Sequence, residues 1–154
     1  GLGMGGRGSF SGGGGGSVSE WFNEKDFKHE DDIDGAAVLR QTKDTSNKEP
    51  VYAGNSNCYI ILDKDEDVPK NICYYKDHKL KYSIDFDYKG NNINVHQHAW
   101  ESRPDPKGGN DIIFRKRHDK SNILPVSQKK LGLVRKIIKK YGLDERYRIT
   151  IEGG

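Results

Sequence analysis

The stretch LKYSIDFDYKGNNINVHQHAW, from Leu80 to Trp100, decides the fold and holds the best candidate site. Its first half alternates between two faces. One face carries Leu80, Tyr82, Ile84, Phe86 and Tyr88, and the other carries Lys81, Ser83, Asp85 and Asp87. Such alternation is typical of a strand with one buried and one wet face. A second strand over Ile93 to Trp100 completes a predicted hairpin.

The length of the hairpin loop sets which side chains meet. A four-residue loop over Lys89–Asn92 places Asp85 opposite His96. A two-residue loop shifts the pairing but keeps the faces, with Asp87 opposite His96 and Asp85 opposite His98. In either even register two imidazoles and two carboxylates share one face, with directly opposed Cβ atoms about 4.5–5.5 Å apart. A three-residue loop would change which side chains lie opposite and weaken the case for a shared site.

This His/Asp face is compatible with three kinds of chemistry. His-x-His on a strand projects both rings to one side, so His96 and His98 with a carboxylate could bind a metal. A carboxylate that orients an imidazole could instead support acid–base catalysis near neutral pH. Ordinary cross-strand pairs on a polar sheet face are the third interpretation.

The basic run Arg115-Lys116-Arg117-His118 favours the catalytic interpretation. A metal-independent ribonuclease needs a general base, a general acid and a cation for the crowded phosphate. We expect His96 and His98 as base and acid, with Arg115 or Arg117 as the cation. His118 is a further candidate if its loop folds back over the sheet. This prediction includes no metal ligand and no cofactor.

The rest of the chain predicts an α+β domain. An antiparallel meander is expected to be packed by a helix from Ser127 to Tyr141, which ends at Gly142. Ser19 is expected to cap a short helix over Glu20 to Lys28, followed by an acidic turn. Further strands are predicted over Ala36–Gln41, Asn57–Leu62, Asn71–Lys76, Ile112–Arg117 and Arg146–Ile151.

The first nineteen of the 154 residues are mostly Gly and Ser. Such a segment cannot repay its ordering entropy, so we expect a flexible arm over residues 1–19 and one domain over residues 20–154. The chain begins at Gly1 rather than Met, which suggests a fragment or a processed piece of a longer protein.

Charge is unevenly distributed. Thirteen Lys and Arg and four Asp and Glu lie between Lys107 and Arg148, a local charge of +9 within a total of +3. A basic C-terminal third suits a nucleic acid or an acidic partner protein, and a solvated helix face explains it equally well. The predicted nucleic-acid contacts are Lys116, Lys129, Lys130, Lys136, Lys140 and Trp100, with Trp100 either stacking on a base or closing a core.

The sequence lacks the signals of a membrane or secreted protein and of a thiolate zinc site. No apolar run approaches 18 residues and no signal peptide is present, so we expect a soluble chain without membrane contact. Cys58 and Cys73 lie in strand-like segments, which favours buried thiols over a disulfide. Without a Cys-x-x-Cys pair, a thiolate zinc site is not expected.

The pattern of Tyr75, His78, Leu80 and Tyr82 before Ile84-Asp-Phe-Asp87, with His96-Gln-His98 and a basic capped helix after it, resembles a known group. It is similar to C-terminal segments of Gram-positive phage and prophage structural proteins of the minor head type. Related architectures place toxin domains behind Gly/Ser-rich linkers, which implies an effector nuclease, in the bacterial cytoplasm or on the virion. Here Trp100 and Arg103 replace further histidines of those segments, which disfavours a metal site.

The sequence therefore predicts a small phage-associated effector that acts on nucleic acid, most plausibly a metal-independent ribonuclease. One alternative is a non-enzymatic virion or protein-interaction module, in which His96 and His98 are solvated. The other is a metal-binding domain. The substrate, the oligomeric state and an accompanying inhibitor protein are left open.

Overall fold

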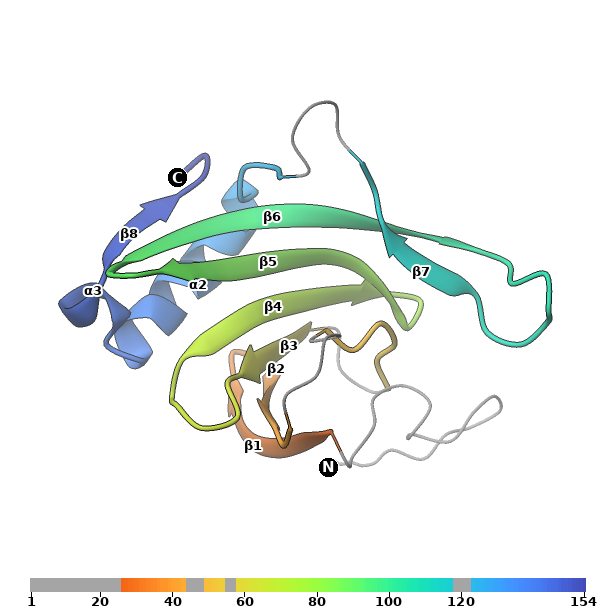
Figure 1. The fold of residues 1–154 in the computed structure, drawn as a ribbon, viewed down its shortest axis with the longest axis horizontal. Coiled ribbons are helices and arrows are strands. Elements are labelled where there is room, and N and C mark those ends of the chain that lie inside the picture. The colour runs from red at the N-terminus through yellow and green to blue at the C-terminus, as the bar shows by residue number, and fades with distance from the viewer. Residues whose placement is uncertain (1–25, 44–48, 55–57, 118–122) are drawn as a thin grey trace.

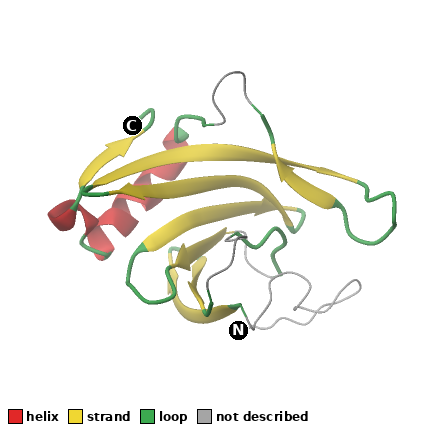
Figure 2. Ribbon diagram, viewed as in Figure 1, coloured by secondary structure: helices red, strands yellow, loops and turns green. Residues whose placement is uncertain are grey.

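The structure is a computed structural model that describes residues 26–43, 49–54, 58–117 and 123–154 (Figure 1). Within them, eight strands form one curved sheet and two helices lie on one of its faces (Figure 2). The predicted arm over residues 1–19 and the candidate His118 lie outside the described residues. The strands are β1 (Phe27–Ile33), β2 (Ala36–Gln41), β3 (Cys58–Leu62), β4 (Pro69–Lys76), β5 (Lys79–Lys89), β6 (Asn92–Arg103), β7 (Ile112–Arg115) and β8 (Arg148–Ile151).

The sheet is mixed, with the order β1 to β7 along one path and β8 beside β6. The pairs β2–β3 and β6–β8 are parallel, and the other pairs are antiparallel. The α+β class is therefore confirmed, but the prediction of an antiparallel sheet is wrong for those two pairs. Alternation within a strand carries no information on strand direction, and both parallel pairs follow long connections.

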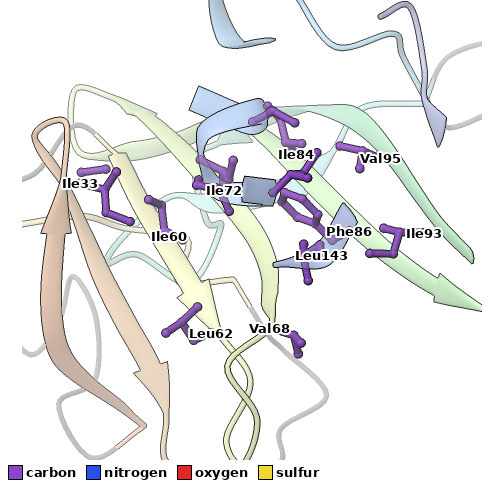
Figure 3. Close-up of a cluster of buried hydrophobic side chains, with 14 of the residues drawn as sticks. Ile33, Ile60, Leu62, Val68, Ile72, Ile84, Phe86, Ile93, Val95 and Leu143 are labelled. Carbon is purple, nitrogen blue, oxygen red and sulfur yellow. The ribbon is translucent and has the colours of Figure 1, made fainter. Parts of the chain in front are cut away.

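Helices α2 (Gln128–Lys140) and α3 (Leu143–Arg146) cover one face of the sheet. The apolar side chains of α2 and Leu143 of α3 pack on alternate residues of β1 to β6 and form the main core (Figure 3). We call this side the helix-covered face. Its sheet residues include Ile60, Ile72, Ile84, Phe86, Ile93 and Val95.

The opposite side of β4, β5 and β6 carries the candidate site, and we call it the site face. Its central residues are Asn71, Ser83, Asp85, His96 and His98. A second apolar cluster, which includes Ala53, Tyr59, Cys73, Tyr75, Leu80 and Trp100, lies outside the main core. Both cysteines are free thiols, as predicted, but only Cys73 is buried, whereas Cys58 is half-buried.

The β5–β6 hairpin has the even register that the site requires. Asp85 pairs with His96, Ser83 with His98, and Asp87 with Asn94. This is the pairing predicted for a four-residue loop. Lys89 and Asn92 add one more pair, so the turn itself contains only Gly90 and Asn91, and Gly90 adopts a φ of 58° that favours glycine.

A β-bulge alters the start of β5. Tyr74 pairs with Tyr82, but the next residue, Tyr75, pairs with Leu80, so Lys81 is an extra residue in this strand. The bulge turns Leu80 to the other side of the sheet, where it joins the second apolar cluster. The prediction that Leu80 shares a face with Tyr82 is therefore wrong.

The N-terminal part of the domain also differs from its prediction. Residues 20–25 lie outside the described residues, but Phe27 and Lys28, the expected end of a helix, belong to β1. Phe27 is buried opposite Gln41, and this tertiary contact outweighs the local helix signal. The acidic stretch that follows continues the strand, and only Asp34 and Gly35 form a turn, both with positive φ.

Candidate functional site

Asp85 is the centre of the candidate site because one of its oxygens contacts both an imidazole and a guanidinium group. Its Oδ2 atom lies 3.2 Å from Nε2 of His98 and 3.2 Å from Nη2 of Arg115. His98 is not directly opposite Asp85 but two residues along β6 from its partner His96, so the contact is diagonal across β5 and β6. Arg115 reaches the site from β7, where it pairs with Trp100.

The 3.2 Å ion-pair contact with Asp85 indicates the tautomer of neutral His98. A carboxylate only accepts, so Nε2 of His98 carries the proton and Nδ1 keeps a free lone pair. The His98 side chain is only 5% exposed. Its Nδ1 atom is buried and has no hydrogen-bond partner among the described residues, and the same is true of Oδ1 of Asp85.

His96 is held in the opposite tautomer by a chain of hydrogen bonds. The Asn94 side-chain amide donates to Oε2 of Glu152 at 2.6 Å, so Oδ1 of Asn94 is the acceptor that faces Nδ1 of His96 at 2.8 Å. Nδ1 therefore carries the proton, and Nε2 of neutral His96 keeps a lone pair. Burial lowers the pKa of His96 and so favours the neutral ring. The negative charge of Asp85 raises this pKa and offsets part of the effect.

The two imidazoles are close neighbours. Their ring centroids lie 4.9 Å apart with an interplanar angle of 85°, an edge-to-face arrangement. The residues are 8% and 4% exposed, so the alternative prediction of solvated histidines on an interaction module is wrong. Three ligand-type atoms, one each from Asp85, His96 and His98, lie within 4.8 Å of one another and could hold a metal ion.

Glu49 joins the site from a loop and was not predicted. It accepts a hydrogen bond from Asn71 at 3.1 Å, and its carboxylate lies 3.6 Å from Nη2 of Arg115. Arg115 therefore bridges the carboxylates of Glu49 and Asp85. Burial raises the pKa of Glu49, and the negative charge of Asp85 raises it further, whereas Arg115 lowers it. No local sequence pattern connects Glu49 with β5, because the contact is purely tertiary.

Trp100 has a structural position in the site face. Its indole Nε1 donates to Oγ of the buried Ser83 at 2.9 Å, and the Arg115 guanidinium lies 5.4 Å from the centre of its ring. The residue is 8% exposed and belongs to the second apolar cluster. This burial fits the alternative in which Trp100 closes a core. In addition, a base could stack on the ring only after Arg115 moved away.

The other predicted contacts are not gathered at the site. Asp87 is half-exposed and lies 3.8 Å from Lys89, while Arg117 is exposed beyond the end of β7. Lys116 is also exposed and pairs with Glu101 at 3.6 Å. These groups can accompany a substrate near Arg115, but the structure does not place them on the histidines.

The helix lysines lie on the opposite side of the sheet from the histidines. Lys136 and Lys140 pair with Asp34 and Asp31 of the β1–β2 hairpin at 2.7 and 3.1 Å. Lys130 lies over the rings of Tyr82 and Tyr74, 3.9 and 4.7 Å from their centroids, and burial lowers its pKa to about 8. Lys129 is exposed. The predicted basic helix contacts therefore cannot line the His/Asp site.

None of the described helices is both long enough and apolar enough to cross a membrane. Comparisons with protein-family models, with curated proteins and with solved structures find no match to this chain.

Proposed function

We propose that this domain is a small effector that cleaves RNA by acid–base chemistry on the site face. The observation that carries the proposal is the contact of one Asp85 oxygen with both His98 and Arg115. A carboxylate that orients an imidazole beside a guanidinium supplies a proton-transfer group and a cation at one place. The resemblance to phage and prophage structural proteins supports a phage-associated origin for such an effector.

The residues can be assigned to the steps of phosphodiester transfer. His96, with its free Nε2 lone pair, takes the proton of the ribose 2′-hydroxyl, and the 2′-oxygen then bonds to phosphorus. His98 acts in its protonated form, beside the Asp85 carboxylate; it gives a proton to the departing 5′-oxygen and becomes neutral, so the products are a 2′,3′-cyclic phosphate and a 5′-hydroxyl. Arg115 balances the extra negative charge on the phosphate oxygens, which removes the need for a metal at that point.

Exposure defines the side from which a phosphate would enter. The side chain of Arg115 is 43% exposed, compared with 17% for Asp85 and 5% for His98. A phosphate therefore meets Arg115 first and reaches the histidines behind it. We assign Lys116 and Arg117 to neighbouring phosphates, and the basic face of α2 to long-range attraction of the nucleic acid from across the sheet.

Cleavage of a labelled RNA by the full chain in the presence of EDTA tests the proposal. His96→Ala and His98→Ala are expected to lower the rate by about 100-fold or more. The matched control is His29→Ala, which removes an exposed histidine that also lies beside a carboxylate, Asp32. Circular dichroism establishes that each variant is folded, and wild-type rates in both site variants would refute the proposal.

A further inference from the structure

The site face also has the arrangement of a metal site. We propose that Asp85, His96 and His98 bind one transition-metal ion of the zinc type, and that the bound ion blocks proton transfer by both histidines. The ion binding stands on the geometry alone, whereas the inhibition rests on the function proposed above. Three side chains from only two strands supply the ligands, and one atom of each lies within 4.8 Å of the others.

The neutral ring of His96 presents a lone pair rather than a proton to a ligand, because the Asn94 contact leaves its Nε2 unprotonated. On His98 the nitrogen that faces Asp85 is Nε2, 3.2 Å from Oδ2, and an ion bound there takes the place of the Nε2 proton. Metal ions bind neutral imidazole nitrogen, and the other ring nitrogen usually donates to a fixed acceptor that orients the ring. Asn94, held in turn by Glu152, is such an acceptor for His96.

Two polar atoms at this place lack a partner. Oδ1 of Asp85 and Nδ1 of His98 are both buried, and no described residue forms a hydrogen bond with either. An unsatisfied buried polar atom costs stability, so native proteins usually pair it with protein, water or an ion. Both atoms are electron-pair donors, and Oδ1 of Asp85 is available to a cation that binds this carboxylate.

The chemistry of the donor atoms selects the class of ion. Two imidazole nitrogens and one carboxylate suit Zn²⁺ and similar borderline ions, whereas Mg²⁺ and Ca²⁺ prefer an all-oxygen environment. At Zn–N and Zn–O distances of 2.0–2.2 Å, tetrahedral ligand atoms stand about 3.3 Å apart. Small side-chain rotations on strands that are already in register can close the present spacing.

Arg115 opposes the ion, and this makes the proposal testable. Its guanidinium lies 3.2 Å from Oδ2 of Asp85, so a divalent ion at Asp85 must either displace this cation or tolerate its charge. Replacing Arg115 with Gln removes the opposing charge while leaving the three ligands in place. We therefore expect Arg115→Gln to bind the ion about tenfold more tightly than the wild type. A destabilised or misfolded variant would not gain affinity.

The experiment is a calorimetric titration of the full chain with ZnCl₂ in chelator-free buffer, repeated with CoCl₂ and visible absorption. The wild type is expected to bind one ion per chain, and His98→Ala and Asp85→Asn are expected to lose saturable binding. Asn94→Ala, which removes only the orienting acceptor, is expected to bind about tenfold more weakly. The control His29→Ala keeps the wild-type affinity, because its removal leaves the three ligands untouched.

Absence of stoichiometric zinc binding by the wild type overturns the inference, as does unchanged affinity in folded His98→Ala. An Arg115→Gln variant that binds no more tightly than the wild type overturns the placement of the ion at Asp85. These outcomes are separate from those of the RNA assay. Zinc binding without RNA cleavage refutes the proposed function and the inhibition that rests on it, but leaves the metal site in place. RNA cleavage without zinc binding refutes this inference alone.

Discussion

The two faces of strands β4, β5 and β6 use adjacent residues for opposite purposes. On the helix-covered face, Ile72 and Ile84 are fully buried in the main apolar core together with the side chains of α2. On the site face, their neighbours Asn71 and Asp85 form hydrogen bonds and ion pairs, and each keeps one buried atom without a partner among the described residues. One face is arranged for stability, whereas the other retains groups that burial penalises.

The two faces also differ in what closes them. The helix-covered face is closed by α2, with four buried side chains, and by Leu143 of α3. The site face is approached by Glu49 from a loop and by Arg115 from the short strand β7, and the side chain of Arg115 remains 43% exposed. Arg115 is therefore a solvent-exposed charged group beside the buried histidines, whereas the helix-covered face has the apolar side of a helix in the corresponding place.

Truncation on the helix-covered face should have the largest effect on stability. Ile84→Ala removes a side chain of the main core and is expected to lower the free energy of unfolding by about 2–5 kcal/mol. Asp85→Asn, one residue later on the other face, is expected to cost about 1–3 kcal/mol while abolishing RNA cleavage. Urea unfolding measures both, and a greater loss in Asp85→Asn would contradict the division between the faces.

The Trp100–Ser83 hydrogen bond should have a smaller effect. Trp100→Phe keeps a ring in place but removes the donor to a fully buried hydroxyl, with an expected cost of about 1–3 kcal/mol. Adding Ser83→Ala should recover part of that loss, since no unsatisfied hydroxyl then remains. A double-mutant cycle by chemical denaturation measures the coupling, and strictly additive changes would show that the hydrogen bond contributes nothing.

The Glu49→Gln substitution should have the smallest effect, a gain in the stability of the folded domain. Its pKa is raised above the ordinary value of 4.5, chiefly by burial and then by Asp85. The folded state therefore favours the protonated form of Glu49. The resulting contribution to stability is present below pH 4.5 and is lost as the pH rises through the pKa of Glu49 in the folded state. Glu49→Gln should melt at a higher temperature than the wild type at pH 7.5, with the difference shrinking towards pH 4. A lower melting temperature at pH 7.5 would show that the Arg115 contact outweighs burial.

The centre of the fold could be predicted from the sequence because its signal is local. Alternation along Leu80 to Tyr88 identified β5, and the hairpin residues between the two strands limited the register to a few choices. The correct choice put Asp85 and His96 side by side. Even here the bulge at Lys81 escaped prediction, because Leu80 and Tyr82 satisfy strict alternation in the sequence.

The contacts that could not be predicted from the sequence join residues that are far apart in the chain. Glu49 reaches Arg115 only after β7 has joined β6, and no local pattern reports that contact. Lys136 and Lys140 remain predicted nucleic-acid contacts, but no local pattern indicated that they also pair with Asp34 and Asp31, which lie about a hundred positions earlier in the chain. The excess of basic residues in the last third is therefore partly neutralised by the acidic hairpin.

The chemical ends of cleaved RNA test the account most directly. An acid–base reaction on the site face, run by the wild-type full chain in EDTA, must leave a 2′,3′-cyclic phosphate and a 5′-hydroxyl, and substitution of the 2′-hydroxyl by hydrogen must abolish it. Mass spectrometry of the products from a short RNA distinguishes these ends from others. We predict cyclic phosphate ends from the wild type and intact RNA from folded His98→Ala. Intact RNA from the wild type, or the same products from both proteins, would contradict the central claim.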